Sequence, residues 1–435
     1  MNSGYQDALD KLYSLERFGI KLGLDNIGRL LAELGDPQLA CRAVHVGGTN
    51  GKGSVARTIA QILTTAGYIT GLYTSPHLQR FTERIWLSGK EIRQDRVASL
   101  LDEIWQAMEK VLAQDPNGTS RPMTYFELVT AMAAKYFEQE NADIVVWEVG
   151  MGGRLDATNT ISPLVTIITT IAFEHQQHLG RSLAEIAGEK AGIIKPDVPV
   201  LTSVSQEAAL DVITSIAKER GAPLLRLGED FSYTRRGKGH MNYEGLSLEI
   251  DDLHLKLEGE HQMANAALAI AALEILKNYF FTTDDEIREG ISRVSWPGRM
   301  ERFKLDHGII LDGAHNADAA KALAAALTYA PSRGKRVMLA GLGDDKDVDS
   351  FFRILSPHVA KIFVTRSARP QAIAPDELAQ TAGQYTAHVE TTDDVRSGLE
   401  RARADLETED ELLICGSLFV VGEAREIIQK ELNPG

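Results

Sequence analysis

The chain has 435 residues, of which 44% are hydrophobic and 25% are charged, and its formal net charge is −15. This length and composition are typical of a soluble globular protein with two or more domains. The negative charge argues against general nucleic-acid binding, and it requires local cations or metal ions wherever an anion is bound.

Cysteine content and hydropathy bear on the cellular compartment. Cys41 and Cys415 are the only cysteines, and two distant thiols are typical of a reducing cytosol rather than of a disulfide framework or a zinc site. Residues 1–7 lack the basic and apolar regions of a signal peptide, and apolar runs such as residues 412–421 are too short to cross a bilayer. We therefore expect a cytoplasmic protein that has no membrane partner.

The first predicted elements are helices within residues 5–40, because leucines recur there on repeating faces. Residues 19–26 lie between them, and two interpretations stay open: a helix connector with Asp25 or Asn26 as the N-cap of the second helix, or a segment that contacts a ligand.

A glycine-rich loop follows a predicted strand at residues 43–46 and precedes a predicted helix at residues 54–63. It contains Gly48, Thr49, Asn50, Gly51, Lys52, Gly53 and Ser54. Such loops close backbone N–H groups around phosphate oxygens, and Lys52 adds a full positive charge. The loop is shorter than the usual P-loop and has no Ser or Thr directly after the lysine. An ordinary tight turn is the alternative, but Gly-Lys-Gly-Ser favours phosphate binding.

Three polar residues lie at or after the ends of predicted strands. Ser75 follows a strand that ends at Thr74, Glu148 ends the run 143–148, and His175 comes after the run 164–170. Parallel sheets place ligands at the carboxyl ends of their strands, and a carboxylate beside a phosphate loop is typical of a Mg²⁺ site. The alternatives are a common Ser-Pro turn, a solvated glutamate and a structural histidine.

Further helices are predicted at residues 94–114, 124–139 and 182–193, with a turn at Asp115–Gly118. Thr124 and Glu127 fit a capping box at the start of the second of these helices. Lys190 lies near the end of the third, where a cation is favourable.

Short strands at residues 199–201 and 223–225 flank a predicted helix at 206–219. The alternation in residues 246–257 around Asp251-Asp252 predicts a hairpin. A helix at residues 261–280 follows, and Asn265, a poor helix former, would ordinarily face solvent there.

A domain boundary is predicted near residues 294–299, where Pro297-Gly298 is typical of a turn. Beyond it, apolar runs at 308–311, 336–340, 361–365 and 411–415 alternate with helical stretches, which predicts a second parallel sheet. Asn316 is expected to cap the helix after the first of these strands. The predicted domains are 1–296 and 297–435.

In their order along the chain these motifs resemble those of the Mur ligase superfamily, and most closely its folate branch, the folylpolyglutamate and dihydrofolate synthases. The resemblance is carried by residues 48–54, 75–78, 124–127, 150–159 and 312–316. It implies an α/β protein with an N-terminal P-loop-type domain, whose mostly parallel sheet has helices on both faces. A smaller C-terminal Rossmann-like α/β domain would follow.

The resemblance also implies site residues. It implies that ATP contacts Gly48, Thr49, Asn50, Gly51, Lys52, Gly53, Ser54, Asn265, Arg299 and Asp312. It implies catalytic roles for Lys52, Lys190 and His315. It implies that two Mg²⁺ ions are held by Ser75, Glu148, His175 and Lys190, with Lys190 as a carbamate. It implies that the substrate contacts Gly23, Leu24, Asp25, Asn26, Thr124, Phe126, Glu127, Gly153, Arg154 and Leu155. Glu174 stands where relatives often carry aspartate.

The implied reaction is ATP-dependent addition of L-glutamate to reduced folates, and also to dihydropteroate, through an acyl phosphate in a monomeric enzyme. One alternative is a Mur-type ligase that acts on a UDP-sugar peptide, against which the form of residues 124–127 argues. The other is a P-loop nucleotide hydrolase or switch, which the absence of Ser or Thr after Lys52 disfavours.

Overall fold

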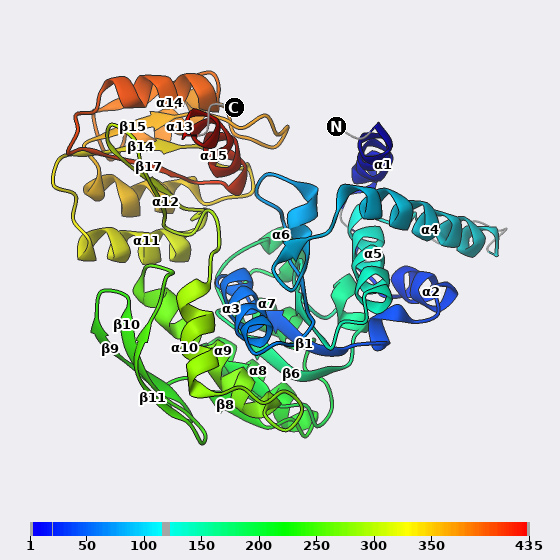
Figure 1. Ribbon diagram of the computed structural model, residues 1–435. Helices are drawn as coiled ribbons and strands as arrows, with labels where there is room; N and C mark the ends of the chain where they lie inside the picture. Colours follow the sequence, from blue (N-terminus) through cyan, green and yellow to red (C-terminus); the bar gives the residue numbers. More distant parts are fainter. Residues whose placement is uncertain (1–2, 20, 115–121, 433–435) are drawn as a thin grey trace. The chain divides into compact units, whose positions relative to one another are not determined.

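The computed structural model describes residues 3–19, 21–114 and 122–432. Their contacts divide the chain into two compact units, and Figure 1 shows the elements of each. Unit 1 comprises Met1–Ala172, Gln176–His254 and Ala264–Val294, and unit 2 comprises Phe173–His175, Leu255–Met263 and Ser295–Gly435. The turn predicted at Asp115–Gly118 lies outside the described residues.

Unit 1 is built on an eight-stranded sheet in which six neighbouring strands pair in parallel and the two strands at one edge join by antiparallel pairing. In sheet order the strands are β4 (Lys90–Glu91), β3 (Ile85–Leu87), β2 (Thr70–Tyr73), β5 (Ile144–Glu148), β1 (Arg42–Gly47), β6 (Pro163–Ile168), β7 (Val200–Thr202) and β8 (Leu224–Arg226). The central strands are buried on both faces, which is why they appear in the sequence as continuous apolar runs.

Helices cover both faces of this sheet. The α-helices of this part of the chain are α1 (Ser3–Tyr13), α2 (Asp25–Glu33), α3 (Lys52–Thr65), α4 (Gln94–Ala113), α5 (Tyr125–Gln139), α6 (Gln176–Leu179), α7 (Leu183–Ala191), α8 (Glu207–Glu219), α9 (Glu260–Leu276) and α10 (Asp284–Arg293). Short 3-10 turns lie at Ser14–Phe18, Pro37–Leu39, Phe81–Arg84 and Ala157–Thr160. Trp147 of β5 packs edge-on against Phe137 of α5, with ring centroids 5.8 Å apart. Because side chains alternate along a strand, Val146 points to the opposite face, where α3 packs.

The starts of two helices show which caps form. Thr124 is the N-cap of α5, since its Oγ1 accepts from Glu127 N at 3.3 Å while Glu127 Oε2 accepts from Thr124 N at 2.8 Å. The predicted capping box is therefore confirmed. The expected N-cap at Asp25 or Asn26 is wrong, because α2 already begins at Asp25, in whose first turn a carboxylate is favourable, and Leu24 is the N-cap.

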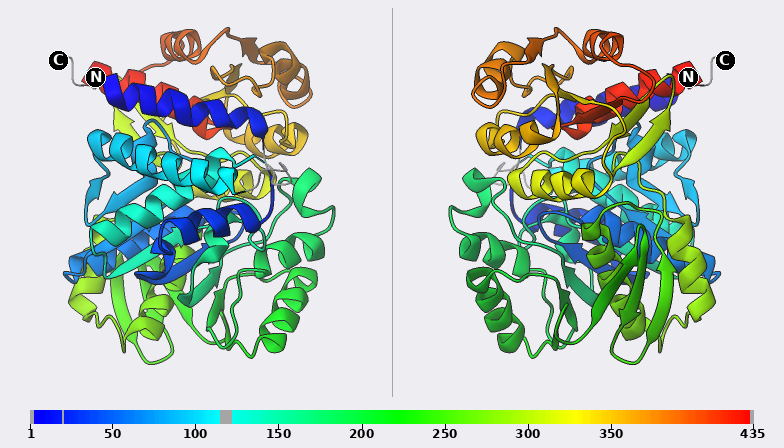
Figure 2. Two further views of the ribbon diagram at one scale, coloured as in Figure 1. Left: turned by 90° about the vertical axis from the view of Figure 1, so that its right-hand side faces the viewer. Right: turned by 90° about the vertical axis from the view of Figure 1, so that its left-hand side faces the viewer.

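A separate antiparallel sheet in unit 1 corrects the hairpin predicted at residues 246–257. Its strands are β9 (Ser232–Gly237), β10 (His240–Glu244) and β11 (Glu249–His254), drawn in green in the right-hand view of Figure 2. Asp251 and Asp252 lie inside β11 at a bulge, where Asn242 Oδ1 accepts from Asp252 N at 3.0 Å. The side-chain amide replaces a ladder bond there, so the chain kinks without reversing.

Unit 2 contains a six-stranded sheet in which only β12 runs antiparallel. In sheet order the strands are β12 (Glu301–Lys304), β13 (Gly308–Leu311), β17 (Glu411–Cys415), β14 (Arg336–Ala340), β15 (Lys361–Val364) and β16 (Val389–Thr391). The prediction found the four central strands and missed the two short, partly exposed edge strands, whose weak apolar pattern gives little signal.

Helices cover both faces of this second sheet as well. They are α11 (Ala317–Tyr329), α12 (Val348–Leu355), α13 (Pro375–Ala382), α14 (Val395–Ala404) and α15 (Leu418–Leu432), with a 3-10 turn at Ser356–His358. One core joins α11, α12 and α13 to alternate residues of the strands, such as Met338 and Leu413. In Figure 1, α11 and α12 lie on one side of the sheet and α14 lies on the other. The predicted fold class is therefore confirmed, and no described helix is long and apolar enough to span a membrane.

Candidate active site

The glycine-rich loop joins the end of β1 to the start of α3. Gly48 has φ 132° and Gly51, the N-cap of α3, has φ 89°. An L-residue with a Cβ adopts these values only with strain, so glycine suits both positions. The first amides of an α-helix have no partner within the helix, which makes the loop at the start of α3 suitable for binding an anion.

Two threonines that follow β6 form hydrogen bonds with the backbone of this loop. Thr169 Oγ1 donates to Asn50 O at 2.7 Å, and Thr170 Oγ1 accepts from Asn50 N at 3.0 Å. Thr49 N donates to Thr170 O at 2.7 Å. The sequence analysis missed both threonines, although two consecutive hydroxyl side chains directly after a buried strand were the available signal.

Two lysines meet at one carbonyl of the loop. Lys52 Nζ donates to Gly48 O at 3.1 Å and to Thr49 O at 3.0 Å. Lys190, which is only 2% exposed at the end of α7, donates to the same Gly48 oxygen at 2.8 Å. Lys190 is thus turned toward the phosphate loop, and the simple role of a surface cation at a helix end is wrong.

Strand register brings Glu148 and Ser75 together. Glu148 pairs with Val46 in β1, and Tyr73 of β2 pairs with Trp147, so the carboxyl ends of all three strands meet beside the loop. Glu148 is 5% exposed, and its Oε2 accepts from Ser75 N at 3.2 Å. A solvated glutamate at this position is therefore excluded.

This pair suits a magnesium ion. Carboxylate and hydroxyl oxygens are ligands that Mg²⁺ accepts, and the ion commonly takes one or two of them together with phosphate oxygens and water. Within the described residues, no cluster of three or more His, Cys, Asp and Glu side chains is arranged to hold a metal. The donors present thus fit a cation that takes most of its ligands from a nucleotide.

The loop after β5 packs on the end of α7. A Cβ added at Gly153 would lie 2.8 Å from Lys190 O, so only glycine allows this approach. Arg154 N donates to Glu189 O at 2.8 Å, and its guanidinium pairs with the Glu189 carboxylate at 2.7 Å. Gly23 N lies 3.5 Å from Leu155 O, so two of the segments predicted to bind substrate are adjacent.

Phe126 and Asn265 each face a glycine of the predicted site. A Cβ at Gly150 would lie 2.4 Å from Phe126 Cζ, which places the start of α5 against the loop after β5. A Cβ at Gly51 would lie 2.5 Å from Asn265 Oδ1. Asn265 is 6% exposed, so the solvent-facing alternative is wrong for this residue.

The predicted residues of unit 2 gather at the carboxyl end of β13. Asp312 Oδ2 accepts from Met300 N at 2.9 Å, and a Cβ at Gly313 would lie 2.2 Å from Arg299 Nη1. His315 Nδ1 donates to Gly313 O at 2.8 Å, which turns Nε2 outward. Asn316 caps α11 as predicted, because its Oδ1 accepts from Ala319 N at 2.8 Å.

Acidic side chains lie near two histidines of this unit, His315 and His175. His315 Nε2 lies 3.5 Å from Glu174 Oε1, and His175 Nδ1 lies 3.5 Å from Asp345 Oδ2. Lys346 pairs with Asp345 at 2.8 Å. Asp345 and Lys346 were not singled out from the sequence, since a charged Gly-Asp-Asp-Lys-Asp loop is usually a solvated turn.

His261, also missed, belongs to the same unit. Burial lowers the pKa of His261, the charge of Arg299 lowers it further, and Asp312 opposes both effects. The imidazole is therefore held neutral beside two residues predicted to contact ATP.

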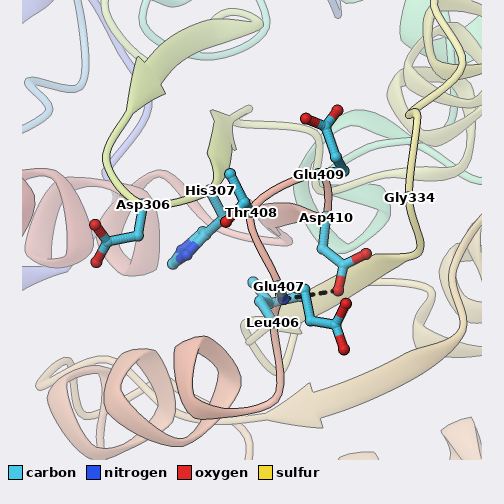
Figure 3. A pocket seen from close by; sticks show the side chains of 8 residues that line it. All are labelled: Asp306, His307, Gly334, Leu406, Glu407, Thr408, Glu409 and Asp410. Carbon is cyan, nitrogen blue, oxygen red and sulfur yellow. Dashed lines mark hydrogen bonds between the residues drawn. The ribbon is translucent and has the colours of Figure 1, made fainter.

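A pocket in unit 2 lies apart from these groups. Figure 3 shows its lining, which consists of Asp306, His307, Gly334, Leu406, Glu407, Thr408, Glu409 and Asp410. These residues precede β13, β14 and β17, so the pocket lies at the amino ends of the strands. Ligands of α/β sheets bind at the carboxyl ends, where Asp312 lies. The pocket is therefore not part of the candidate site.

Comparisons with known proteins agree with this geometry. Residues 46–273 match the Mur ligase middle domain, and residues 298–418 match the Mur ligase glutamate ligase domain. A dihydrofolate synthase/folylpolyglutamate synthase of Bacillus subtilis is 34% identical, over 98% of this chain and 99% of the relative.

Solved structures show the same likeness. A Mycobacterium tuberculosis folylpolyglutamate synthase complexed with ADP superposes with a TM-score of 0.92 at 32% identity, over 98% of each chain. Escherichia coli FolC in complex with DHPP and ADP superposes with a TM-score of 0.89 at 31% identity, again over 98% of each chain. The chain therefore belongs to the dihydrofolate synthase/folylpolyglutamate synthase family of the Mur ligase superfamily.

Proposed function

We propose that the protein is an ATP-dependent ligase that joins the amino group of L-glutamate to a carboxylate of a folate. The observation that carries this proposal is the phosphate loop, whose Gly48 carbonyl is held by Lys52 and Lys190. The relatives that are similar to this protein over 98% of its length are named for this reaction. The relatives solved with ADP and AMPPCP support ATP as the nucleotide.

The chemistry explains the need for ATP. A carboxylate is a poor electrophile, because its leaving group would be an oxide. Transfer of the γ-phosphoryl group to the folate carboxylate gives an acyl phosphate, whose leaving group is phosphate. The amino group of glutamate attacks this carbonyl, and the tetrahedral intermediate collapses to the amide and phosphate.

The protein contributes positioning and charge neutralisation to this reaction. Residues 48–54 bind the nucleotide phosphates through backbone amides, and Lys52 faces the developing negative charge. Asn265, Arg299 and Asp312 contact ATP, and His315 lies near the transferred phosphate. Residues 23–26, 124–127 and 153–155 bind the folate. We propose that these residues belong to two domains, residues 1–296 and residues 297–435.

Ser75 and Glu148 would hold one Mg²⁺, and we assign His175 and Lys190 as ligands of a second. When bound, these ions neutralise phosphate charge and polarise the transferred group. Lys190 acts as a carbamate: an amine removed from water favours its neutral form, which reacts with CO₂ to give a carboxylate. An ammonium group offers no oxygen ligand, whereas a carbamate does.

Dihydropteroate is a second substrate of the same site. The form of residues 124–127 supports this assignment, as do the relatives named dihydrofolate synthase/folylpolyglutamate synthase. Purified protein is expected to ligate glutamate both to dihydropteroate and to a reduced folate. Turnover of the folate alone, without binding of dihydropteroate, would limit the enzyme to folylpolyglutamate synthesis.

One assay separates this function from the alternatives. Phosphate release from ATP is measured with and without glutamate and a folate. A ligase releases phosphate only when both are present, and a hydrolase does so without either. A Mur-type ligase with another acceptor would stay inactive with folates and pteroates.

A further inference from the structure

A buried hydrogen-bond chain joins β1 to the loop that follows β5. His45 Nε2 lies 2.9 Å from Thr158 Oγ1. Thr158 Oγ1 lies 2.5 Å from Asp156 Oδ1, and Asp156 Oδ2 accepts from Met151 N at 2.9 Å. His45 and Thr158 are 0% exposed and Asp156 is 5% exposed, so water does not compete for these bonds.

The chain has a defined proton order. A threonine hydroxyl has one proton, and the Asp156 carboxylate can only accept, so Thr158 donates to Asp156. Thr158 Oγ1 must then accept from His45, which fixes the proton of the imidazole on Nε2. Burial, and secondarily the charge of Lys195, lower the pKa of His45 to about 3, so the ring is neutral at working pH. His45 Nδ1 has no hydrogen-bond partner within the described residues.

Asp156 closes the loop after β5 on itself. Its Oδ1 accepts from Thr158 N at 3.0 Å as well as from the hydroxyl, while Oδ2 holds Met151 N from the other end of the loop. Burial raises the pKa of Asp156, and the hydrogen bond from Thr158 is the largest opposing effect. The hydroxyl therefore helps to keep this carboxylate charged and able to hold both ends of the loop.

We propose that His45 and Thr158 are positioning residues for the folate. They orient the Asp156 carboxylate, which fixes the loop of residues 150–158 and hence Gly153, Arg154 and Leu155. The inference rests on the proposed function, which places these three residues at the folate. Because His45 lies on the strand that ends in the phosphate loop, one strand supports the nucleotide loop and orients the folate loop.

Thr166 provides a matched control. It is the register partner of His45 on β6, it is 0% exposed, and its Oγ1 has no hydrogen-bond partner within the described residues. Thr158→Val and Thr166→Val therefore make the same change in the same buried layer. Only Thr158→Val interrupts the hydrogen bonds that link His45 to Asp156.

The expected result is a selective loss of folate binding. Thr158→Val and His45→Leu should raise the KM for folate by about tenfold or more, the scale of one hydrogen bond to a charged group, with the KM for ATP within about twofold of wild type. Thr166→Val should leave both constants near wild type. His45→Gln, which offers an N–H at similar reach, should restore most of the folate affinity lost in His45→Leu.

Two further measurements test whether His45 acts through the hydrogen bonds to Thr158 and Asp156. The double variant His45→Leu/Thr158→Val should be no worse than Thr158→Val alone, because His45 acts through Thr158. Hydrogen exchange at the Met151 amide should accelerate in Thr158→Val and not in Thr166→Val. If Thr158→Val does not fold, the pair His45→Leu and His45→Gln carries the same test.

The outcomes are distinguishable. An active Thr158→Val enzyme with unchanged KM for folate would overturn this inference alone, as would equal effects of Thr158→Val and Thr166→Val. A wild-type protein with no glutamate-dependent turnover of folates would overturn the proposed function, and this inference with it.

Discussion

Lys190 Nζ donates a hydrogen bond of 2.8 Å to Gly48 O, although the two residues lie 142 positions apart in the chain. Lys52 donates to the same oxygen at 3.1 Å. Two lysine side chains thus hold the carbonyl side of the peptide unit that opens the loop. The positive charge of Lys52 locally counteracts the formal net charge of −15, which disfavours anionic ligands over the molecule as a whole.

The first prediction concerns Lys52. Lys52→Ala should lower turnover by at least about 100-fold, because it removes a charge that faces the developing negative charge of phosphoryl transfer. Steady-state ligation of glutamate to a folate measures this effect, and thermal unfolding checks that the variant is folded. Lys218→Ala, an exposed change on α8, is the control. Ligation by Lys52→Ala near the wild-type rate would refute the assignment of the phosphate loop.

The second prediction concerns the carbamate on Lys190. Lys190→Ala should lose most ligase activity, and acetate should restore part of it by occupying the vacated site next to Gly48. Lys195→Ala is the control, because Lys195 Nζ donates instead to Asn159 O at 2.8 Å and lies outside the candidate site. Rescue by acetate should be absent there.

A crystal grown with bicarbonate, Mg²⁺ and nucleotide examines the same group directly. Density for a carboxylate on Lys190 Nζ is the expected result. A bare ammonium in a fully liganded site would refute the carbamate.

The local part of the site could be predicted from the sequence. The glycines of residues 48–53 and the strand-end positions of Ser75 and Glu148 have local signals, and parallel pairing then brings the strand ends together. The capping box of Thr124 and Glu127 was predictable for the same reason, since it depends on residues three positions apart.

Long-range contacts could not be predicted in this way. No local pattern indicates that Lys190 reaches Gly48, and two hydroxyl side chains after a strand do not by themselves identify Asn50 as the partner of Thr169 and Thr170. The hairpin at residues 246–257 was misplaced because Asp251-Asp252 is typical both of a turn and of a bulge. Only the side chain of Asn242, on the neighbouring strand, selects the bulge.

The third prediction concerns acid stability and His45. Its pKa is about 3 in the folded protein against an ordinary value of 6.5, so below pH 6.5 the unfolded chain binds a proton that the folded chain does not. The free energy of unfolding should therefore fall by about 1.4 kcal/mol per pH unit as the pH drops from 6.5 toward 3, from this group alone. Above pH 6.5 the contribution vanishes.

His45→Gln removes the titrating group and keeps an N–H donor. Urea unfolding at about pH 7.5 and about pH 5.5 should show a smaller loss of stability for this variant than for wild type, by about 1 kcal/mol. Thr166→Val, which keeps His45, should retain the wild-type pH dependence. Equal losses in wild type and His45→Gln would mean that His45 does not titrate with the shifted pKa.

The last prediction separates backbone strain from steric intrusion at Gly51. Gly51 and Gly67 lie at the two ends of α3, with φ 89° and φ 92°. Alanine at either position should cost about 1–2 kcal/mol of stability, because its Cβ disfavours positive φ. A Cβ at Gly51 would also lie 2.5 Å from Asn265 Oδ1, whereas a Cβ at Gly67 would meet nothing within 4 Å.

The two variants should therefore lose similar stability and differ in catalysis. Gly51→Ala must displace either Asn265 or the phosphate loop, and a shift of this size costs on the order of 100-fold in kcat/KM for ATP. Gly67→Ala should keep kcat/KM for ATP near wild type. This result would show that backbone strain at an end of α3 does not by itself lower kcat/KM for ATP. Equal kcat/KM for ATP in both variants would place Asn265 and the Gly51 turn outside the nucleotide site, because only the contact at Gly51 distinguishes the two substitutions.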